Sequence, residues 1–149
     1  MANIGALILA AGESSRLGRP KQLIQFRGKS LIRRIVDAAD ETGCSPIAVV
    51  IGSDGKKMAP ELERTSAATV ENENWRKGIG TSIRAGMQSL IEHGPGLNAV
   101  ILLACDQPFV EKELIKQLIA RYGKTGKTKV IRERSACRHF STVPILRNF

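Results

Sequence analysis

The chain has 149 residues, of which 42% are hydrophobic, enough for one domain that buries roughly two thirds of the surface exposed by its unfolded chain. No apolar run approaches the ~20 residues that cross a membrane, and no basic segment precedes the short apolar run at the start, so we expect a cytoplasmic protein without a membrane partner. Three cysteines without a C-x-x-C spacing argue against a disulfide framework and a structural zinc site.

The net charge of +9 is unevenly distributed along the chain. Residues 1–122 contain 16 Lys and Arg against 13 Asp and Glu, a balance of +3, and residues 123–149 supply the remaining +6. A zinc spacing, a helix-turn-helix pattern and an aromatic stacking platform are all missing from the sequence. We therefore expect no nucleic-acid partner, although a small basic nucleic-acid-binding protein stays the alternative from another functional class.

The first half of the chain alternates apolar runs with amphipathic stretches. Residues 4–10 form a nearly continuous apolar run before Gly12, which is typical of a strand buried on both faces of a parallel sheet. Ser30 can cap a helix over residues 31–42, and Gly43 can end it. Next we expect a β-branched strand at 46–52, a weakly patterned helix at 58–64 and a third strand at 67–71.

The second half continues the alternation. Thr81 or Ser82 can cap a helix that closes at residues 93–95, and an all-apolar strand follows at 99–104. A last helix opens near Glu111 and ends at Gly123. This order predicts one α/β domain, a three-layer Rossmann-like sandwich with a mostly parallel sheet, in which ligands bind at the carboxyl ends of the strands.

The loop after the first strand has the features of a triphosphate cradle. Gly12 lets backbone amides approach a phosphate, while Arg16 and Lys21 supply positive charge. The spacing is neither that of a P-loop nor that of the dinucleotide-binding fingerprint. An ordinary basic loop between a strand and a helix is the alternative interpretation.

Two later segments could complete such a site. Asp106 follows the strand at 99–104 and is a natural Mg²⁺ ligand, because Mg²⁺ is commonly held by one or two carboxylates together with substrate phosphates. The alternative is an aspartate that caps the turn before Pro108. Residues 72–82 form a polar, glycine-bearing loop that runs into a helix N-terminus, a place where anions bind.

Three motifs carry a resemblance to a known family: Leu9-Ala10-Ala11-Gly12, Ser15-Arg16-Leu17-Gly18 and Pro20-Lys21-Gln22-Leu23. Together they resemble the molybdenum cofactor nucleotidyltransferases. Guanylyltransferases of that family carry a second glycine where this chain has Ala11, and their acidic motif lacks the glutamine found here at Gln107. The cytidylyltransferase branch is therefore the more similar one.

The resemblance implies transfer of CMP from CTP to the phosphate of molybdopterin, with release of pyrophosphate, Mg²⁺ as the cofactor and a molybdoenzyme as a candidate recipient. Guanylyl transfer from GTP and a sugar-phosphate acceptor are alternatives. The implied catalytic residues are Lys21, Arg16 and Asp106, and Asp106 is also the metal ligand. The implied nucleotide-binding residues are Leu9, Ala10, Ala11, Gly12, Arg16, Lys21, Asn74, Gly78 and Ser82. Trp75 we interpret as a packing residue.

We expect the resemblance to stop near Tyr122, which divides the chain into a nucleotidyltransferase domain at 1–122 and an atypical basic tail at 123–149. The tail suits a disordered end or a translation in a shifted reading frame, and we favour the second because the charge changes abruptly there. The family's later Gly-x-Pro and Gly-Asp-x-Gly-Ala-Arg stretches do not occur. An incomplete C-terminal part and a chain that binds nucleotide but turns over poorly are the corresponding expectations.

Overall fold

A five-stranded sheet forms the centre of the computed structural model, which describes residues 2–12, 18–125, 131–133, 141–143 and 145–147. The strand order is β5-β4-β1-β6-β9. Neighbouring strands pair in parallel from β5 to β6, and β9 pairs antiparallel to β6. The strands are β1 (Ile4–Ala10), β4 (Ile47–Ile51), β5 (Ala68–Glu71), β6 (Ala99–Ala104) and β9 (Ile145–Arg147).

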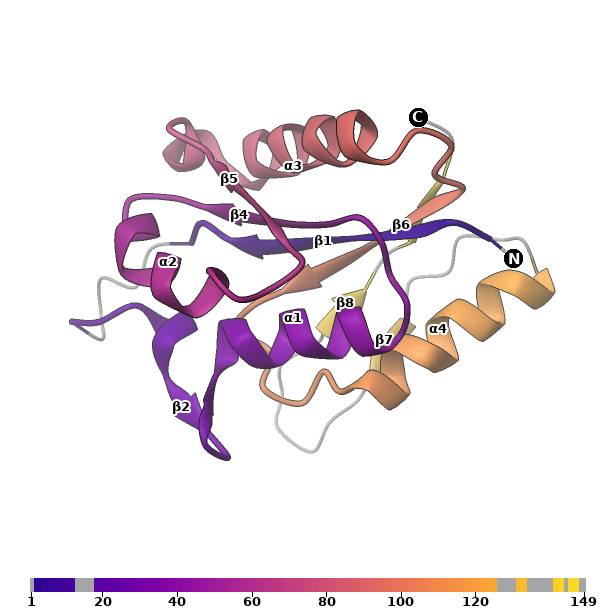
Figure 1. Cartoon of the computed structure of the whole chain (residues 1–149), viewed down its shortest axis with the longest axis horizontal. Helices are drawn as coiled ribbons and strands as arrows, with labels where there is room; N and C mark the ends of the chain where they lie inside the picture. Colours follow the sequence, from indigo (N-terminus) through magenta and orange to yellow (C-terminus); the bar gives the residue numbers. More distant parts are fainter. Residues whose placement is uncertain (1, 13–17, 126–130, 134–140, 144, 148–149) are drawn as a thin grey trace.

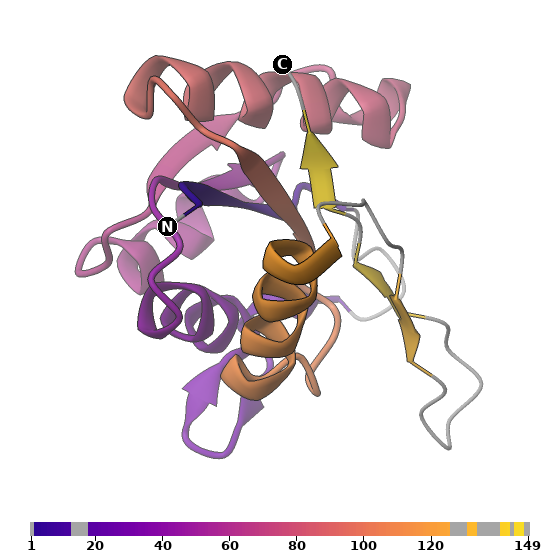
Figure 2. The ribbon, with the colours of Figure 1, turned by 90° about the vertical axis from the view of Figure 1, so that its right-hand side faces the viewer.

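Helices cover both faces of this sheet, as Figures 1 and 2 show. Successive side chains of a strand point to opposite faces, so Ile8 and Ala10 join one buried cluster while Leu7 and Ala11 join another with Leu90. The predicted three-layer α/β sandwich is therefore confirmed. The helices are α1 (Leu31–Glu41), α2 (Gly55–Leu62) and α4 (Lys112–Thr125) on the first face, and α3 (Ile79–His93) on the second.

The position of β1 between β4 and β6 opens a crevice at one end of the sheet. The chain leaves β1 toward the α1 layer and returns as β4 on one side, whereas β6 joins β1 on the other side. The strand order thus reverses between β1 and β6, and in open α/β sheets ligands bind at the carboxyl ends of the strands at such a point. Gly12 and Asp106 follow these two strands.

Both ends of α1 and the end of α3 at His93 agree with the prediction, whereas the start of α3 does not. Ser30 Oγ accepts a hydrogen bond from the Arg33 N–H at 3.3 Å, and Gly43 takes a positive φ of 80° just after α1. The expected cap of α3 by Thr81 or Ser82 is wrong, because α3 begins at Ile79 after Gly78, which makes no side-chain cap. Gly78 has a φ of 121°, a conformation that favours glycine. It lets the helix begin at Ile79, two residues before the predicted cap at Thr81.

Two further elements differ from the expectation. The hairpin of β2 (Gln25–Phe26) and β3 (Lys29–Ser30) was not predicted. Arg27 and Gly28 form its two-residue turn and both have positive φ, 51° and 80°, as the twist of a tight hairpin requires. Helix α4 continues to Thr125, past Gly123, where we expected it to end. A glycine in a helix costs only about 1 kcal/mol relative to alanine, so it need not end one.

The described part of the segment beyond Thr125 consists of short strands. β7 (Ile131–Glu133) pairs with β8 (Ser141–Val143), and β9 extends the main sheet through pairs such as Val100 with Leu146. The edge of β6 thus has a backbone partner, as Figure 2 shows. The domain boundary drawn at residue 122 stays a prediction. Within the described ranges, no helix is both long and apolar enough to cross a membrane.

Replacing Gly86 with alanine should destabilise the fold, because α3 lies against the sheet at this glycine. A Cβ at Gly86 would collide with Leu7 Cδ1 and lie 2.7 Å from Val50 Cγ2. Overpacking of this kind costs about 1–3 kcal/mol of unfolding free energy, which urea denaturation would measure. Gly80→Ala is the matched control in the same helix, since its Cβ would meet nothing within 4 Å. Equal stabilities of the two variants would contradict this packing.

Candidate functional site

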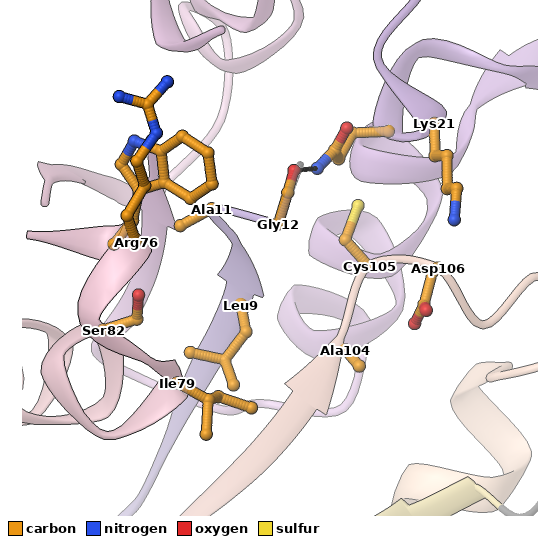
Figure 3. A pocket seen from close by; sticks show the side chains of 12 residues that line it. Leu9, Ala11, Gly12, Lys21, Arg76, Ile79, Ser82, Ala104, Cys105 and Asp106 are labelled. Carbon is orange, nitrogen blue, oxygen red and sulfur yellow. Dashed lines mark hydrogen bonds between the residues drawn. The ribbon is translucent and has the colours of Figure 1, made fainter. Parts of the chain in front are cut away.

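A cavity of about 460 Å³ lies at the carboxyl ends of β1 and β6, where it is also bounded by the start of α3 (Figure 3). This is the crevice that the strand order creates. Its described walls are formed by Leu9, Ala11, Gly12, Lys21, Gln22, Trp75, Arg76, Ile79, Ser82, Ala104, Cys105 and Asp106.

One side of the cavity is charged. Lys21 begins the short 3₁₀ helix η2 (Lys21–Leu23), and Asp106 stands two residues after the end of β6, both exposed. The Cys105 N–H donates to the Leu9 carbonyl at 3.1 Å, which holds the chain beside β1 up to the residue before Asp106. Figure 3 shows Lys21 and Asp106 on the same side of the cavity. A cation and a carboxylate here suit a phosphate group and the metal ion that accompanies it.

Gln22 holds the beginning of the loop that follows β1. Its side chain is buried, and Nε2 donates to the carbonyls of Ala10 at 2.9 Å and Gly12 at 3.4 Å. Its Oε1 is buried and has no hydrogen-bond partner within the described residues. The sequence did not indicate a role for Gln22. Its hydrogen-bond partners Ala10 and Gly12 lie ten or more residues earlier, and no local pattern links them to a glutamine.

The opposite side of the cavity combines apolar and aromatic surface with the Arg76 guanidinium. Trp75 belongs to the 3₁₀ helix η3 (Trp75–Lys77) and packs against the cluster around Leu90. Gly52 makes room for it, since a Cβ there would lie 3.1 Å from Trp75 Cγ. The Arg76 guanidinium lies 4.9 Å from the centroid of the Trp75 ring, close enough for a cation–π contact. Trp75 therefore packs, as expected, and also lines the cavity.

The structure brings together most of the residues predicted for the site. Ala10 instead points into the core on the other face of the sheet, with 1% of its surface exposed. Asn74 and Gly78 are exposed and are not among the described residues of the cavity wall, and Arg16 lies outside the described residues. The predicted residues that line the cavity are Leu9, Ala11, Gly12, Lys21, Ser82 and Asp106.

Asn72, which the sequence analysis passed over, is the buried amide of the loop before α3. Only 7% of its surface is exposed, and its Nδ2 donates to Ser82 Oγ at 2.8 Å. The predictions for Asn74, Gly78 and Ser82 came from a segment of the resembled family with the pattern Asn-x-x-Trp-x-x-Gly-x-x-x-Ser. In this chain the asparagine of that pattern is Asn72, three residues before Trp75, and not Asn74. Counting the motif from Trp75 would have found this residue.

Cys105 lies in the cavity wall as a neutral thiol. It is 3% exposed, and burial, with a smaller contribution from the negative charge of Asp106, raises its pKa to about 12. Because the thiolate is the nucleophilic form, Cys105 is unsuited to attack a substrate at neutral pH. Among its described residues, the cavity wall therefore has no activated thiol.

Asp106 fits a divalent cation that is shared with a bound phosphate. Within the described residues no cluster of three or more His, Cys, Asp or Glu side chains could hold a metal ion by itself. Mg²⁺ is often bound by one or two carboxylates, with the remaining positions filled by water and substrate phosphates. The carboxylate of Asp106 makes no hydrogen bond in the described part of the chain, so the alternative of a turn cap before Pro108 finds no support.

The fold and the cavity define an α/β domain of the Rossmann-like class with its ligand site at the reversal of strand order. Residues 6–144 match the family model of the MobA-like NTP transferase domain, and the chain belongs to this family of nucleotidyltransferase domains. The match runs beyond Tyr122, so the expectation that the resemblance stops there is wrong. The charge of the tail was the signal behind that expectation, and charge says little about fold.

Among curated relatives, the chain is 30% identical over 125 residues to the bifunctional protein GlmU of Bifidobacterium animalis subsp. lactis, with 81% of the chain and 27% of GlmU covered. It is 27% identical to the nicotine blue oxidoreductase of Paenarthrobacter nicotinovorans, over 80% of the chain and 57% of that protein. The chain thus spans about a quarter of the first relative and little more than half of the second.

The solved structure of Rv0371c from Mycobacterium tuberculosis shares the fold. It superposes with a TM-score of 0.79 at 22% identity and covers 98% of this chain and 71% of its own. A second structure of Rv0371c, which contains manganese, gives a TM-score of 0.67 at 23% identity, with 97% of this chain and 70% of its own covered. One structural neighbour of the chain has therefore been solved as a complex with manganese.

The raised pKa of Cys105 predicts that this thiol resists alkylation in the folded protein. At a pH below the ordinary thiol value of 9.0, iodoacetamide should leave Cys105 and Cys44 unmodified, because both are buried and protonated. Mass spectrometry of a Cys137→Ser variant would measure this without a contribution from the third cysteine. The same protein unfolded in urea is the control and should be modified at both positions. Labelling of folded Cys105 as fast as in urea would contradict the burial.

Proposed function

We propose that the protein is a nucleotidyltransferase that transfers CMP from CTP to the phosphate of molybdopterin and releases pyrophosphate. The observation that carries this proposal is the division of the cavity into a side with Lys21 and Asp106 and an opposite side with Ile79 and Arg76. The guanidinium of Arg76 lies over the ring of Trp75, so this second side has an aromatic surface for a base. A nucleoside triphosphate has the same division between its phosphates and its base. Family membership supports the reaction class.

The charged side would hold the triphosphate. The ammonium group of Lys21 would accompany the phosphates, and the exposed backbone at Gly12 would let them approach the loop that Gln22 holds in place. Arg16 would add a second cation from the same loop. When bound at Asp106, Mg²⁺ would supply neutralising charge for the phosphate oxygens.

The reaction would need no covalent intermediate on the protein. A phosphate oxygen of molybdopterin attacks the α-phosphorus of CTP, and pyrophosphate leaves from the opposite side. The chain contributes orientation of the two phosphates and a fixed positive charge at Lys21 that offsets the charge of the departing pyrophosphate. The neutral thiol of Cys105 in the same wall is consistent with a direct transfer.

The choice of donor and acceptor rests on the sequence resemblance. Ala11 lines the cavity and is 7% exposed, and an alanine at this position is similar to the cytidylyltransferase branch. Guanylyl transfer and transfer to a sugar phosphate would use the same charged side, so they differ only in the base and the acceptor. A molybdoenzyme that receives the product is the partner we propose.

The proposal predicts that the protein releases pyrophosphate from CTP and Mg²⁺ in the presence of molybdopterin. Lys21→Ala should lower kcat/KM by about 100- to 1000-fold, the usual cost of removing one group that stabilises transition-state charge. Asp106→Ala should cause a comparable loss and weaken the dependence on Mg²⁺. A coupled pyrophosphate assay measures both. Lys56→Ala is the control, because Lys56 is exposed on α2, away from the cavity wall.

Other outcomes would favour the alternatives. A higher kcat/KM with GTP would indicate guanylyl transfer, and turnover only with a sugar phosphate would replace the acceptor. If CTP with Mg²⁺ gave no saturable binding while DNA bound with a steep dependence on salt, the nucleic-acid interpretation would prevail. Equal activity of Lys21→Ala and Lys56→Ala would remove Lys21 from the mechanism.

A further inference from the structure

The orientation of the Gln22 side-chain amide is determined by two backbone carbonyls. Its Nε2 lies 2.9 Å from the Ala10 oxygen and 3.4 Å from the Gly12 oxygen, and the longer bond is drawn as a dashed line at Gly12 in Figure 3. A carbonyl can only accept, so the atom that faces both of them must be the NH₂ group. Both hydrogens of this group are therefore used by the end of β1 and the residue that follows Ala11.

These two hydrogen bonds join two elements of the charged side of the cavity. Ala10 and Gly12 lie at the end of β1 and the start of the loop after it, whereas Gln22 directly follows Lys21 in η2. The turn of η2 is closed by the Ile24 N–H, which donates to the Lys21 carbonyl at 3.1 Å. The backbone that carries the Lys21 ammonium group is thus linked, one residue away, to the backbone of the loop.

The carboxylate of Asp106 is tied to the same strand end. The N–H of Cys105, the residue before Asp106, donates to the Leu9 carbonyl at 3.1 Å. Carbonyl groups at the end of β1 therefore hold the segments of both charged residues, one through a backbone N–H and the other through the Gln22 side chain. The end of β1 is a common reference for the positions of the cation and the carboxylate.

The amide oxygen of Gln22 indicates that this position requires the donors. Oε1 is buried and has no hydrogen-bond partner within the described residues, and a buried acceptor without a partner lowers the stability of the folded chain. A methionine of similar length would fill the space without that loss. Local losses of stability of this kind are expected where function demands them. Packing alone therefore does not account for a glutamine at this position.

We propose that Gln22 is a positioning residue that makes the cation of Lys21 and the backbone at Gly12 one preformed unit for a triphosphate. This inference rests on the proposed function, because it assumes that a nucleoside triphosphate binds in the cavity. A triphosphate is long enough to meet both groups at once, whereas the single phosphate of CMP meets one of them. Only the triphosphate gains from their fixed separation. Gln22 favours it through Lys21 and the loop and need not touch the nucleotide.

The test is Gln22→Met, which keeps the length of the side chain and removes its donors. The ratio of CTP affinity to CMP affinity, measured by calorimetric titration with Mg²⁺, should fall by about tenfold or more, the effect of a lost hydrogen-bonded link. Gln25→Met is the matched control and should keep the native ratio, because Gln25 is exposed in β2 and outside the described cavity wall. An unchanged ratio in folded Gln22→Met, or an equal fall in Gln25→Met, would overturn the inference.

A double variant separates positioning from a general loss of structure. Lys21→Ala removes the cation that Gln22 is proposed to position. In this background Gln22→Met should change the ratio little further, because residues that act through one another are not additive. A second full fall of the ratio in the Lys21→Ala background would overturn the inference in favour of a structural role.

A measurement on the native protein covers the case in which Gln22→Met does not fold. If the bonds of Gln22 favour triphosphate binding, triphosphate binding must favour those bonds by the same factor. Saturating CTP with Mg²⁺ should therefore slow hydrogen exchange of the Gln22 side-chain amide, followed by NMR, about tenfold more than saturating CMP does. Equal exchange with the two nucleotides would overturn the inference and leave the proposed function standing. Absence of any saturable nucleotide binding by the native chain would overturn both.

Discussion

The parallel pairing of β1 with two neighbours is the constraint on which the rest of the structure depends. β1 pairs with β4 on one side and β6 on the other, in registers that place Leu9 beside both Val50 and Ala104. A strand in this position is buried on both faces, so its side chains are apolar. Its backbone N–H and C=O groups must form hydrogen bonds with the two neighbouring strands, because no water reaches them. The cavity lies at the carboxyl ends of β1 and β6, where the strand order reverses.

The alternation of side chains along β1 divides the residues of one motif between two environments. Leu9 and Ala11 face the layer of α3 and line the cavity, whereas Ala10 faces the layer of α1 and α4 and belongs to the core. A motif that is continuous in sequence is thus only partly a binding motif in space. Its small residues serve two purposes, since Ala10 packs the core and Ala11 leaves room at the cavity wall.

The start of α3 joins the fold to the chemistry of the cavity. Gly78 lets the helix begin at Ile79, and Asn72 binds the hydroxyls of Thr81 and Ser82 through donors only. These bonds secure the loop before α3 to the start of the helix. A buried amide whose hydrogen bonds are all made is costly to rearrange, so Asn72 keeps the cavity wall at Ser82 in place.

The sequence by itself determined the alternation of strands and helices, the fold class and the two strand ends that are followed by Gly12 and Asp106. These features depend on local periodicity and on glycine and capping residues, which are readable within a few positions. The early start of α3 after Gly78 and the hairpin around Arg27 are local features that the sequence patterns did not indicate. The attachment of β9 to β6 was decided by tertiary structure, because its two strands are distant in the chain. The roles of Gln22 and Asn72 could not be predicted either. Both side chains are uncharged, and they meet their hydrogen-bond partners only when the loops after β1 and β5 pack against the sheet and α3.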